Sequence, residues 1–305
     1  RDKYREKISL NKILDIASLE KNFLDKVFDL TATISNDWPN VEQIGAGKTI
    51  CLLFWEPSTR TKLSFEHAAK KLGFNVLDFS PEHSSVKKGE SFEDTILTLL
   101  AMQVDGFIIR HPEDHISKTI SSMLPDNVFY INAGDGNHAH PTQAMLDVFT
   151  MKEKFNDLSN LKVTILGDVN HSRVIPSQIE LLKKYSCSDI NFIGPESLIS
   201  KKFSPSFSEI PKDFLIERDI LFILRIQKER FKDDDDLDET KFIENFQVNE
   251  EFIKNTGFNG YLMHPGPMNI DAEITRNVAN GKNSLVLKQV ENGLYLRTAL
   301  LSLML

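Results

Sequence analysis

The chain has 305 residues, of which 41% are hydrophobic and 26% are charged, and its formal net charge at pH 7 is −8. This length and composition are typical of a soluble enzyme with two domains of ordinary size. The negative charge argues against a nucleic-acid surface, because affinity for a phosphate backbone requires concentrated Lys and Arg. Any anion-binding site must therefore be confined to a small cluster of residues and cannot be an extended basic surface.

The chain begins with RDKYREKISLNKILDIASLE and not with Met. This segment lacks the hydrophobic region of a signal peptide, and no apolar run reaches the roughly 18 residues that a membrane span requires. The two cysteines, Cys51 and Cys187, are far apart and fit neither a CxxC motif nor a disulfide framework. A cytoplasmic, membrane-free protein is expected.

Apolar runs that resemble strands alternate with helical patterns in two series. The first series comprises 49–55, 75–79, 106–111 and 128–132. After a helix that begins at Pro141 and a polar stretch, the second series comprises 161–168, 189–194, 219–225 and 260–265. The pattern predicts an α/β fold with two doubly wound parallel-sheet domains. Amphipathic helices near the two chain ends are expected to bridge the domains.

The segment from Cys51 to Gly73 runs from an apolar strand through Ser-Thr-Arg-Thr into a helix. Hydroxyls, free backbone N–H groups, the helix dipole and a guanidinium converge at such a point and favour phosphate or acyl phosphate. A simpler reading makes the hydroxyls helix caps only. The helix is expected to end at Gly73 and to pack through Leu63, Phe65, Ala68, Ala69 and Leu72.

Two glycine-containing segments do not support nucleotide binding. Gly45 to Thr49 resembles the end of a P-loop, but Glu42 stands where a glycine is required and a strand follows. The GDVNHSR segment, 167–173, lacks the GxGxxG pattern of a dinucleotide loop. An NAD-dependent oxidoreductase is therefore disfavoured. The acidic run at 231–240 is typical of a solvated loop.

Polar residues follow several predicted strands at their carboxyl ends, where open α/β sheets bind ligands. They are Arg110, His140, Gln143, Arg173, Arg225, Gln227 and the segment 264–267. One such Arg could be a surface ion pair, but four, counting Arg60, indicate a ligand with several negative charges. His138 and His140 after Asp135 lack a third ligand at metal spacing, so hydrogen-bonding histidines and no metal are expected.

Seven motifs in order give the chain a family resemblance from about residue 50 to 300: FWEPSTRTKLSFE, SSVKKGESFEDT, IIRHP, INAGDGNHAHPTQAMLD, GDVNHSRV, RIQKERF and HPGPMN. The chain resembles the aspartate branch of the aspartate/ornithine carbamoyltransferase family. The resemblance implies a carbamoyltransferase-like fold. It also implies transfer of the carbamoyl group from carbamoyl phosphate to the α-amino group of L-aspartate, in pyrimidine biosynthesis, without a cofactor.

The resemblance also assigns roles to individual residues. For carbamoyl phosphate it implies Ser58, Thr59, Arg60, Thr61, Ser84, Lys88, Arg110, His140, Gln143, Gly266 and Pro267. For aspartate it implies Lys88, Arg173, Arg225 and Gln227. The catalytic residues would be Arg60, Thr61, Lys88, Arg110 and His140. Donors to the carbonyl oxygen would stabilise the charge that develops in the tetrahedral transition state.

The domain roles follow from the same resemblance. Residues 1–135, completed by the C-terminal helix 285–305, would bind carbamoyl phosphate; 136–155 would be an interdomain helix; and 156–284 would bind aspartate. Ser84 and Lys88 match a loop that reaches the neighbouring subunit's site in the family, which implies a homotrimer with shared active sites. Regulatory or dihydroorotase-like partner chains are left open. The loop 230–246 is hypothesised to close over aspartate.

Two positions depart from the family pattern: Lys62 and Ile270 stand where arginine is usual. Ornithine as the acceptor is disfavoured because HCLP and a DxxxSMG-type motif are absent and Arg225 would repel a side-chain ammonium. A non-catalytic scaffold subunit would be expected to have lost Ser58, Arg60, His140 or Lys88, all of which are present.

Overall fold

The computed structural model describes residues 11–79, 89–199, 202–231 and 237–305. The chain forms two compact units, which we call unit 1 (residues 1–146 and 290–305) and unit 2 (residues 147–289). The division falls inside two helices, α5 (Pro141–Lys154) and α10 (Val286–Leu303), so both run from one unit into the other. The N-terminal helix, α1 (Lys21–Asn36), belongs entirely to unit 1.

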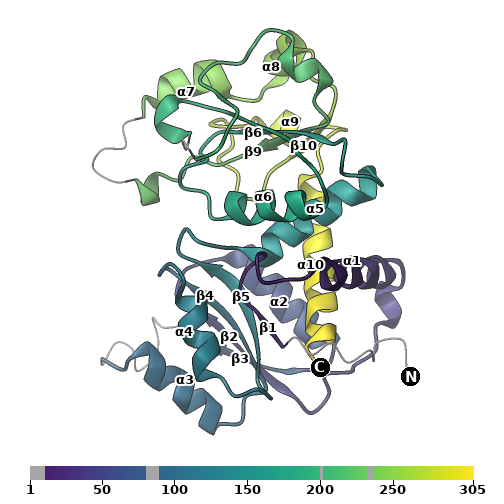
Figure 1. Cartoon of the computed structure of the whole chain (residues 1–305), viewed down its shortest axis with the longest axis vertical. Coiled ribbons are helices and arrows are strands. Elements are labelled where there is room, and N and C mark those ends of the chain that lie inside the picture. The colour runs from purple at the N-terminus through teal and green to yellow at the C-terminus, as the bar shows by residue number, and fades with distance from the viewer. Residues whose placement is uncertain (1–10, 80–88, 200–201, 232–236) are drawn as a thin grey trace. The chain divides into compact units, whose positions relative to one another are not determined.

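Unit 1 is built on a parallel sheet with strand order β1-β5-β4-β2-β3 (Figure 1). Its strands are β1 (Lys12–Ile13), β2 (Thr49–Phe54), β3 (Asn75–Phe79), β4 (Gly106–His111) and β5 (Phe129–Asp135). Its other helices are α2 (Thr59–Lys71), α3 (Phe92–Ala101) and α4 (Ile116–Met123). The four strands predicted for this half are confirmed, whereas the two-residue β1 was not predicted.

The core of unit 1 explains which helix faces are apolar. Side chains of α3 and α4 pack with Cys51 and Phe107 on one face of the sheet. In α2, the residues Phe65, Ala68 and Ala69 are buried, as predicted. The prediction for Leu63 was wrong, because this side chain is 56% exposed. It precedes Phe65 by two positions, and residues two apart on a helix face in different directions.

Unit 2 has a second parallel sheet, with strand order β10-β9-β6-β7-β8. Its strands are β6 (Lys162–Leu166), β7 (Asp189–Ile193), β8 (Ser206–Phe207), β9 (Ile220–Ile223) and β10 (Tyr261–Met263). Its helices are α6 (Val174–Lys184), α7 (Glu239–Phe246), α8 (Glu250–Thr256) and α9 (Arg276–Ala279). All strands except β8 were predicted.

The segment 230–246 is not a loop throughout, which corrects one expectation. Asp238 caps α7 by accepting a hydrogen bond from the Lys241 backbone N–H. Phe242 and Phe246 then lie four residues apart in the core of unit 2, and both are buried. The predicted acidic loop therefore ends at this cap, because an apolar face with helical spacing follows it.

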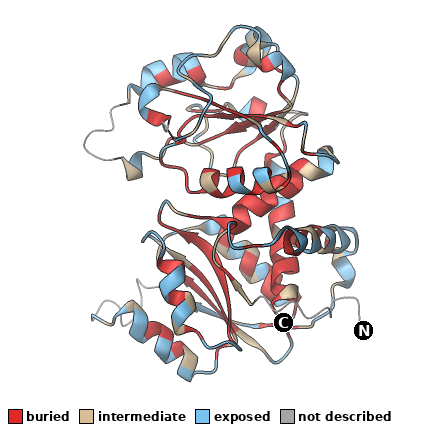
Figure 2. Cartoon of the chain, in the orientation of Figure 1, coloured by how far each residue is buried: buried red, intermediate tan, exposed pale blue. Residues whose placement is uncertain are grey.

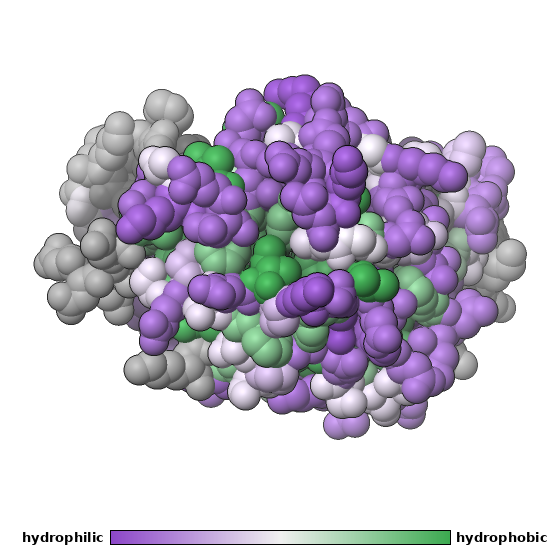
Figure 3. Space-filling view, turned by 90° about the horizontal axis from the view of Figure 1, so that it is seen from above, coloured by the Kyte–Doolittle hydropathy of each residue, from purple (hydrophilic) through white to green (hydrophobic). Residues whose placement is uncertain are grey.

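The burial pattern is that of two doubly wound sheets, whose strands are largely buried while many helices expose one side (Figure 2). One face of the protein is mostly hydrophilic around a small hydrophobic area (Figure 3). Within the described ranges, no helix is both long enough and apolar enough to cross a membrane.

Candidate active site

The predicted anion-binding residues of unit 1 lie at one edge of its sheet. Strand order reverses between β2 and β4, since the chain builds outward to β3 on one side and to β5 on the other. Phe54 at the end of β2 pairs with Arg110 at the end of β4, and His140 follows the neighbouring β5. Carboxyl ends of strands at such a reversal form a ligand-binding crevice. The sheet thus brings Ser58 to Thr61, Arg110 and His140 to the same edge.

The start of α2 presents hydrogen-bond donors at this edge. Its first-turn N–H groups have no acceptor within the helix. Ser58 holds the N-cap position but its side chain accepts no capping hydrogen bond, so the hydroxyl is not used as a helix cap. Thr61 is buried, whereas Thr59 and Arg60 are exposed. Desolvation lowers the pKa of Arg60, but an arginine side chain stays cationic at neutral pH.

Arg110 and His140 are held by their surroundings in unit 1. The Arg110 Nε atom lies 3.4 Å from a carboxylate oxygen of Glu56, and the Arg110 carbonyl accepts a hydrogen bond from the Trp55 N–H. His140 is buried directly before α5, and Gln143 is buried in the first turn of that helix. The end of β4 and the start of α5 thus carry these side chains to the sheet edge.

His138 makes a hydrogen bond, as predicted. His138 Nδ1 lies 3.1 Å from the carboxylate of buried Asp135, which also accepts from Ser117. Burial lowers the pKa of His111, whose Nδ1 lies 3.2 Å from the Glu113 N–H nitrogen and accepts its hydrogen bond. No group of three or more His, Cys, Asp or Glu suited to a metal ion lies among the residues described.

Unit 2 has its own reversal of strand order, between β6 and β9. The buried carboxylate of Asp168, just after β6, accepts hydrogen bonds from His171 Nδ1 at 2.7 Å and from the Gln227 N–H at 3.0 Å. Gln227 Nε2 in turn donates to the His171 carbonyl at 2.9 Å. These bonds tie the loop that carries Arg173 to the loop that carries Arg225.

A glycine allows the chain just after β6 to approach the chain just after β9 closely. Gly167 has a φ of +118°, and a Cβ atom there would lie 2.5 Å from the Leu224 carbonyl oxygen. Only glycine accepts both conditions without a shift of the backbone. The GDVNHSR segment therefore forms a close strand-to-strand contact, although it lacks the dinucleotide pattern.

Arg225 is paired within its own loop. Its two terminal nitrogens donate to both carboxylate oxygens of Glu229, one of them at 3.2 Å. Desolvation raises the pKa of Glu229, but hydrogen bonds, chiefly from Arg225, outweigh it and the net shift is downward. Glu229 is therefore ionised at neutral pH. The Arg225 guanidinium was expected to bind a carboxylate of the ligand. In this structure the carboxylate of Glu229 orients it.

The loop after β10 is organised around buried His264. Its Nδ1 accepts from the Gly266 N–H at 2.9 Å, which requires that Nδ1 carry no proton. Its Nε2 therefore donates to Glu273, 3.1 Å away, and Glu273 also accepts from the Asn269 N–H. This pair holds the segment that contains Gly266 and Pro267.

The two departures from the family pattern have structural counterparts. Lys62 Nζ forms an ion pair with Asp78 at 2.7 Å, so it faces β3. Ile270 is partly buried and packs against the core of unit 2. An arginine at position 270 would therefore require a different local packing.

Sequence reasoning missed three carboxylates that organise the site: Asp168, Glu229 and Glu273. Two of them could have been identified from the sequence. Asp168 is the last residue of the predicted strand 161–168, and Glu229 is four residues after Arg225. Ser84 and Lys88 lie outside the described residues. The thiols are poor nucleophiles, since burial raises the pKa of Cys51 to about 12 and that of Cys187 to about 11.

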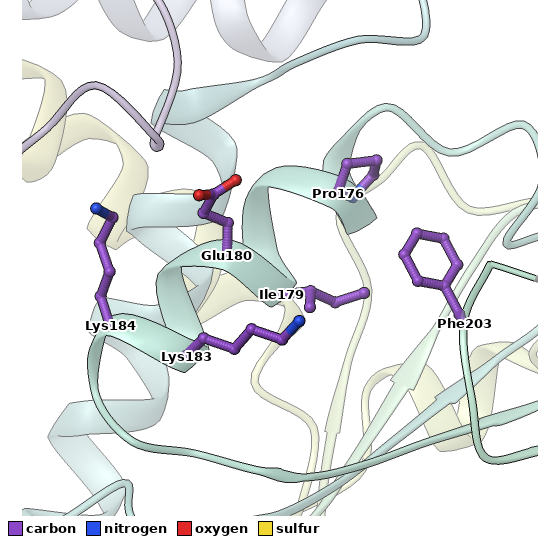
Figure 4. Close-up of a pocket in the computed structure, with 6 residues that line it drawn as sticks. All are labelled: Pro176, Ile179, Glu180, Lys183, Lys184 and Phe203. Carbon is purple, nitrogen blue, oxygen red and sulfur yellow. The ribbon is translucent and has the colours of Figure 1, made fainter.

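A cavity of about 470 Å³ lies elsewhere in unit 2, beside α6 (Figure 4). Its lining consists of Pro176, Ile179, Glu180, Lys183, Lys184 and Phe203. None of the predicted site residues lines it. The cavity is therefore not part of the predicted site.

Fold and site together define a class: proteins of two doubly wound α/β units, each with cationic side chains where strand order reverses. The family model described as "Aspartate/ornithine carbamoyltransferase, carbamoyl-P binding domain" matches residues 11–153. The model "Aspartate/ornithine carbamoyltransferase, Asp/Orn binding domain" matches residues 159–304. The chain belongs to the aspartate/ornithine carbamoyltransferase family.

Named relatives fit this assignment. The chain is 40% identical over 264 residues to the aspartate carbamoyltransferase catalytic subunit of Xanthomonas oryzae pv. oryzae, covering 85% of this chain and 84% of the relative. It is similar to the catalytic subunit of aspartate transcarbamoylase from M. jannaschii, with 28% identity, a TM-score of 0.83 and coverage of 96% and 97% of the two chains. A Trypanosoma cruzi aspartate transcarbamoylase in complex with carbamoyl aspartate and phosphate is 25% identical, with a TM-score of 0.84 and coverage of 96% and 95%.

Proposed function

We propose that the protein transfers the carbamoyl group of carbamoyl phosphate to the α-amino group of L-aspartate, giving N-carbamoyl-L-aspartate and phosphate. The observation that carries the proposal is that hydrogen bonds tie the loop of Arg173 to the loop of Arg225 and Gln227 at the strand reversal of unit 2. Two guanidinium groups suit an acceptor with two carboxylates. The name of the Xanthomonas relative and the ligands of the Trypanosoma cruzi enzyme support the same reaction.

Unit 1 is assigned carbamoyl phosphate. Residues 58–61 at the start of α2 would hold its phosphate together with Arg110. Thr61, Arg110 and His140 would donate to the carbonyl oxygen. The carbamoyl NH₂ is assigned to Gln143 and to the carbonyl of Pro267, beside Gly266, in the loop that His264 organises. Residues 1–135 with the C-terminal helix would form this binding domain, and 156–284 the aspartate-binding domain.

The chemistry requires no covalent intermediate with the protein. The neutral amine of aspartate attacks the carbonyl carbon, and negative charge develops on the carbonyl oxygen. The C–O bond to phosphate then breaks, and the departing phosphate takes the amine proton. Positioning of the substrates and stabilisation of the oxyanion by fixed donors account for catalysis.

A homotrimer with shared active sites is part of the proposal. Ser84 and Lys88 would enter a neighbouring subunit's site. In unit 1, β3 is an edge strand, and Leu63 and Leu77 are 56% and 39% exposed, which suits burial against another subunit. Free buried thiols are consistent with the cytoplasm. Sedimentation of the protein alone, and then with regulatory or dihydroorotase-like chains, would test the assembly.

The function is tested by mixing the purified protein with carbamoyl phosphate and either L-aspartate or L-ornithine, and identifying the product. We expect carbamoyl aspartate and an equal amount of phosphate, with no citrulline. Citrulline would show that the role given to Arg225 is wrong. A confirmed oligomer without turnover of either acceptor would contradict the enzyme assignment and favour a scaffold subunit.

Replacement of Glu229 by Gln should raise the KM for aspartate about fivefold, because an unanchored Arg225 loses its preorganised orientation. The effect is modest because Glu229 is 55% exposed and such ion pairs are weak. The KM for carbamoyl phosphate should not change. The measurement is initial-rate kinetics with each substrate varied. A lower KM for aspartate would mean instead that Glu229 competes with the substrate carboxylate.

A further inference from the structure

The C-terminal helix contributes a buried cation to the interior of unit 1. Arg297 of α10 is 3% exposed, and its guanidinium lies over the Phe65 ring, 5.2 Å from the centroid. Its Nη1 donates to Ser64 Oγ at 2.9 Å. Its Nη2 donates to Thr142 Oγ1 at 3.4 Å, a longer and weaker contact. One side chain thus joins α2 and α5, which are far apart in the sequence.

Both contacts lead to predicted site residues. The Ser64 hydroxyl, which accepts from Arg297, donates to the Thr61 carbonyl at 3.0 Å. Thr142 is fully buried in the first turn of α5, between His140 and Gln143. The bonds therefore connect the start of α2 with the start of α5.

Gly293 provides the space for this arrangement. It lies one turn before Arg297 in α10, and long helical side chains point back toward the helix N-terminus. A Cβ atom at position 293 would lie 2.8 Å from Arg297 Nη1 and 3.1 Å from Leu146 Cδ2. The guanidinium occupies the volume that a side chain at 293 would take.

We propose that Arg297 is a positioning residue that sets the spacing between the two halves of the carbamoyl-phosphate site. The guanidinium holds the α2 residues that bind phosphate in register with the α5 residues that bind the carbamoyl group. This role rests on the proposed function of unit 1. A guanidinium presents several donors in a fixed planar fork and can bridge two helices, whereas an ammonium is a compact charge on a flexible stem that holds its partners less firmly.

The test compares Arg297→Met, Arg297→Lys and Gly293→Ala in the full-length protein. We expect about a tenfold rise in the KM for carbamoyl phosphate and in the Kd for inorganic phosphate with Arg297→Met, because misplaced binding groups lose affinity steeply. For Arg297→Lys, both the KM and the Kd should lie between the values of wild type and of Arg297→Met. Gly293→Ala should raise both constants about threefold, although alanine favours the helix. The KM for aspartate should stay within about twofold of wild type in each variant.

Two further variants separate positioning from general stability. Ser64→Ala should raise the KM for carbamoyl phosphate in the wild type but have no further effect on Arg297→Met, because both changes break one chain of bonds. Thr298→Ala is the matched control, since this buried hydroxyl donates within its own helix to the Leu294 carbonyl. It should lower the melting temperature without changing either KM.

Phosphate affinity distinguishes failure of this inference from failure of the proposed function. If the wild type binds phosphate and the Gly293→Ala and Ser64→Ala variants bind it equally well, the proposed role of Arg297 is wrong. Wild type that neither binds phosphate nor turns over carbamoyl phosphate would overturn the function on which it rests. If Arg297→Met does not fold, Gly293→Ala and Ser64→Ala still decide the question.

Discussion

Replacement of Arg60 by Met is expected to lower kcat/KM for carbamoyl phosphate by about 10²–10³-fold, the effect of removing one preorganised donor that stabilises negative charge, here on the departing phosphate. Within the described residues, Arg60 has no hydrogen bond or ion pair with another side chain. It lies in the first turn of α2, where a cation is unfavourable by about 0.3–1 kcal/mol because of the helix dipole. The position therefore suits an anionic ligand rather than fold stability.

The stability of the Arg60→Met variant should accordingly equal or slightly exceed that of wild type in urea unfolding. Lys62→Met is the matched control on the same helix, because Lys62 is paired with Asp78 on β3. It should change kcat/KM by less than about threefold, as expected for a partly exposed ion pair. Wild-type kinetics in Arg60→Met would place the phosphate away from α2.

The strand series was predictable because parallel strands buried on both faces read as apolar runs. Two-residue strands such as β1 and β8 are too short to give a pattern. The helix α7 was obscured by the acidic run that precedes it, although Phe242 and Phe246 have helical spacing. Leu63 is apolar but lies two positions before Phe65, on another side of the helix, so its hydrophobicity does not indicate burial.

The site was predictable to the extent that ligand residues follow strands. Arg110, Arg173 and Arg225 all come at or after strand ends, and sheet order brings such residues together within each unit. The supporting residues were not predictable in the same way. The bond between Asp168 and the Gln227 backbone joins residues 59 positions apart, and Arg297 acts on α2 from the other end of the chain. Such contacts depend on packing and leave no local pattern.

Replacement of Asp168 by Asn should raise the KM for aspartate about 30-fold, with little change in the KM for carbamoyl phosphate. The amide keeps the shape of the carboxylate but turns an NH₂ group toward either the Gln227 N–H or the ring of His171. Loss of a hydrogen bond to a charged group is worth about 1.5–3 kcal/mol. The loops that carry Arg173 and Gln227 would then lose their common anchor.

Asp219→Asn is the matched control for this change. Asp219 also joins β6 to β9, by accepting from the Lys162 N–H at 2.8 Å, but it does so at the amino-terminal edge of the sheet. It should lower the free energy of unfolding and leave the KM for aspartate within about twofold, since the site lies at the opposite edge. If the two variants showed equal increases in the KM for aspartate, Asp168 would have a structural role only.

The pH dependence gives an independent test of Asp168. Burial raises the pKa of its carboxyl above the ordinary 3.8, although hydrogen bonds from Gln227 and His171 oppose the shift. A folded pKa above the unfolded one means that its contribution to stability is full below the unfolded pKa and is lost as pH rises through the folded pKa. The wild type should therefore gain stability relative to Asp168→Asn as the pH falls from 7 toward the pKa of Asp168 in the unfolded chain.

Over the same pH range, protonation of Asp168 should weaken its contacts with the loops. The wild-type KM for aspartate should therefore rise more steeply than that of the variant. Parallel pH profiles of urea unfolding and of KM in the two proteins would contradict the role of this carboxylate.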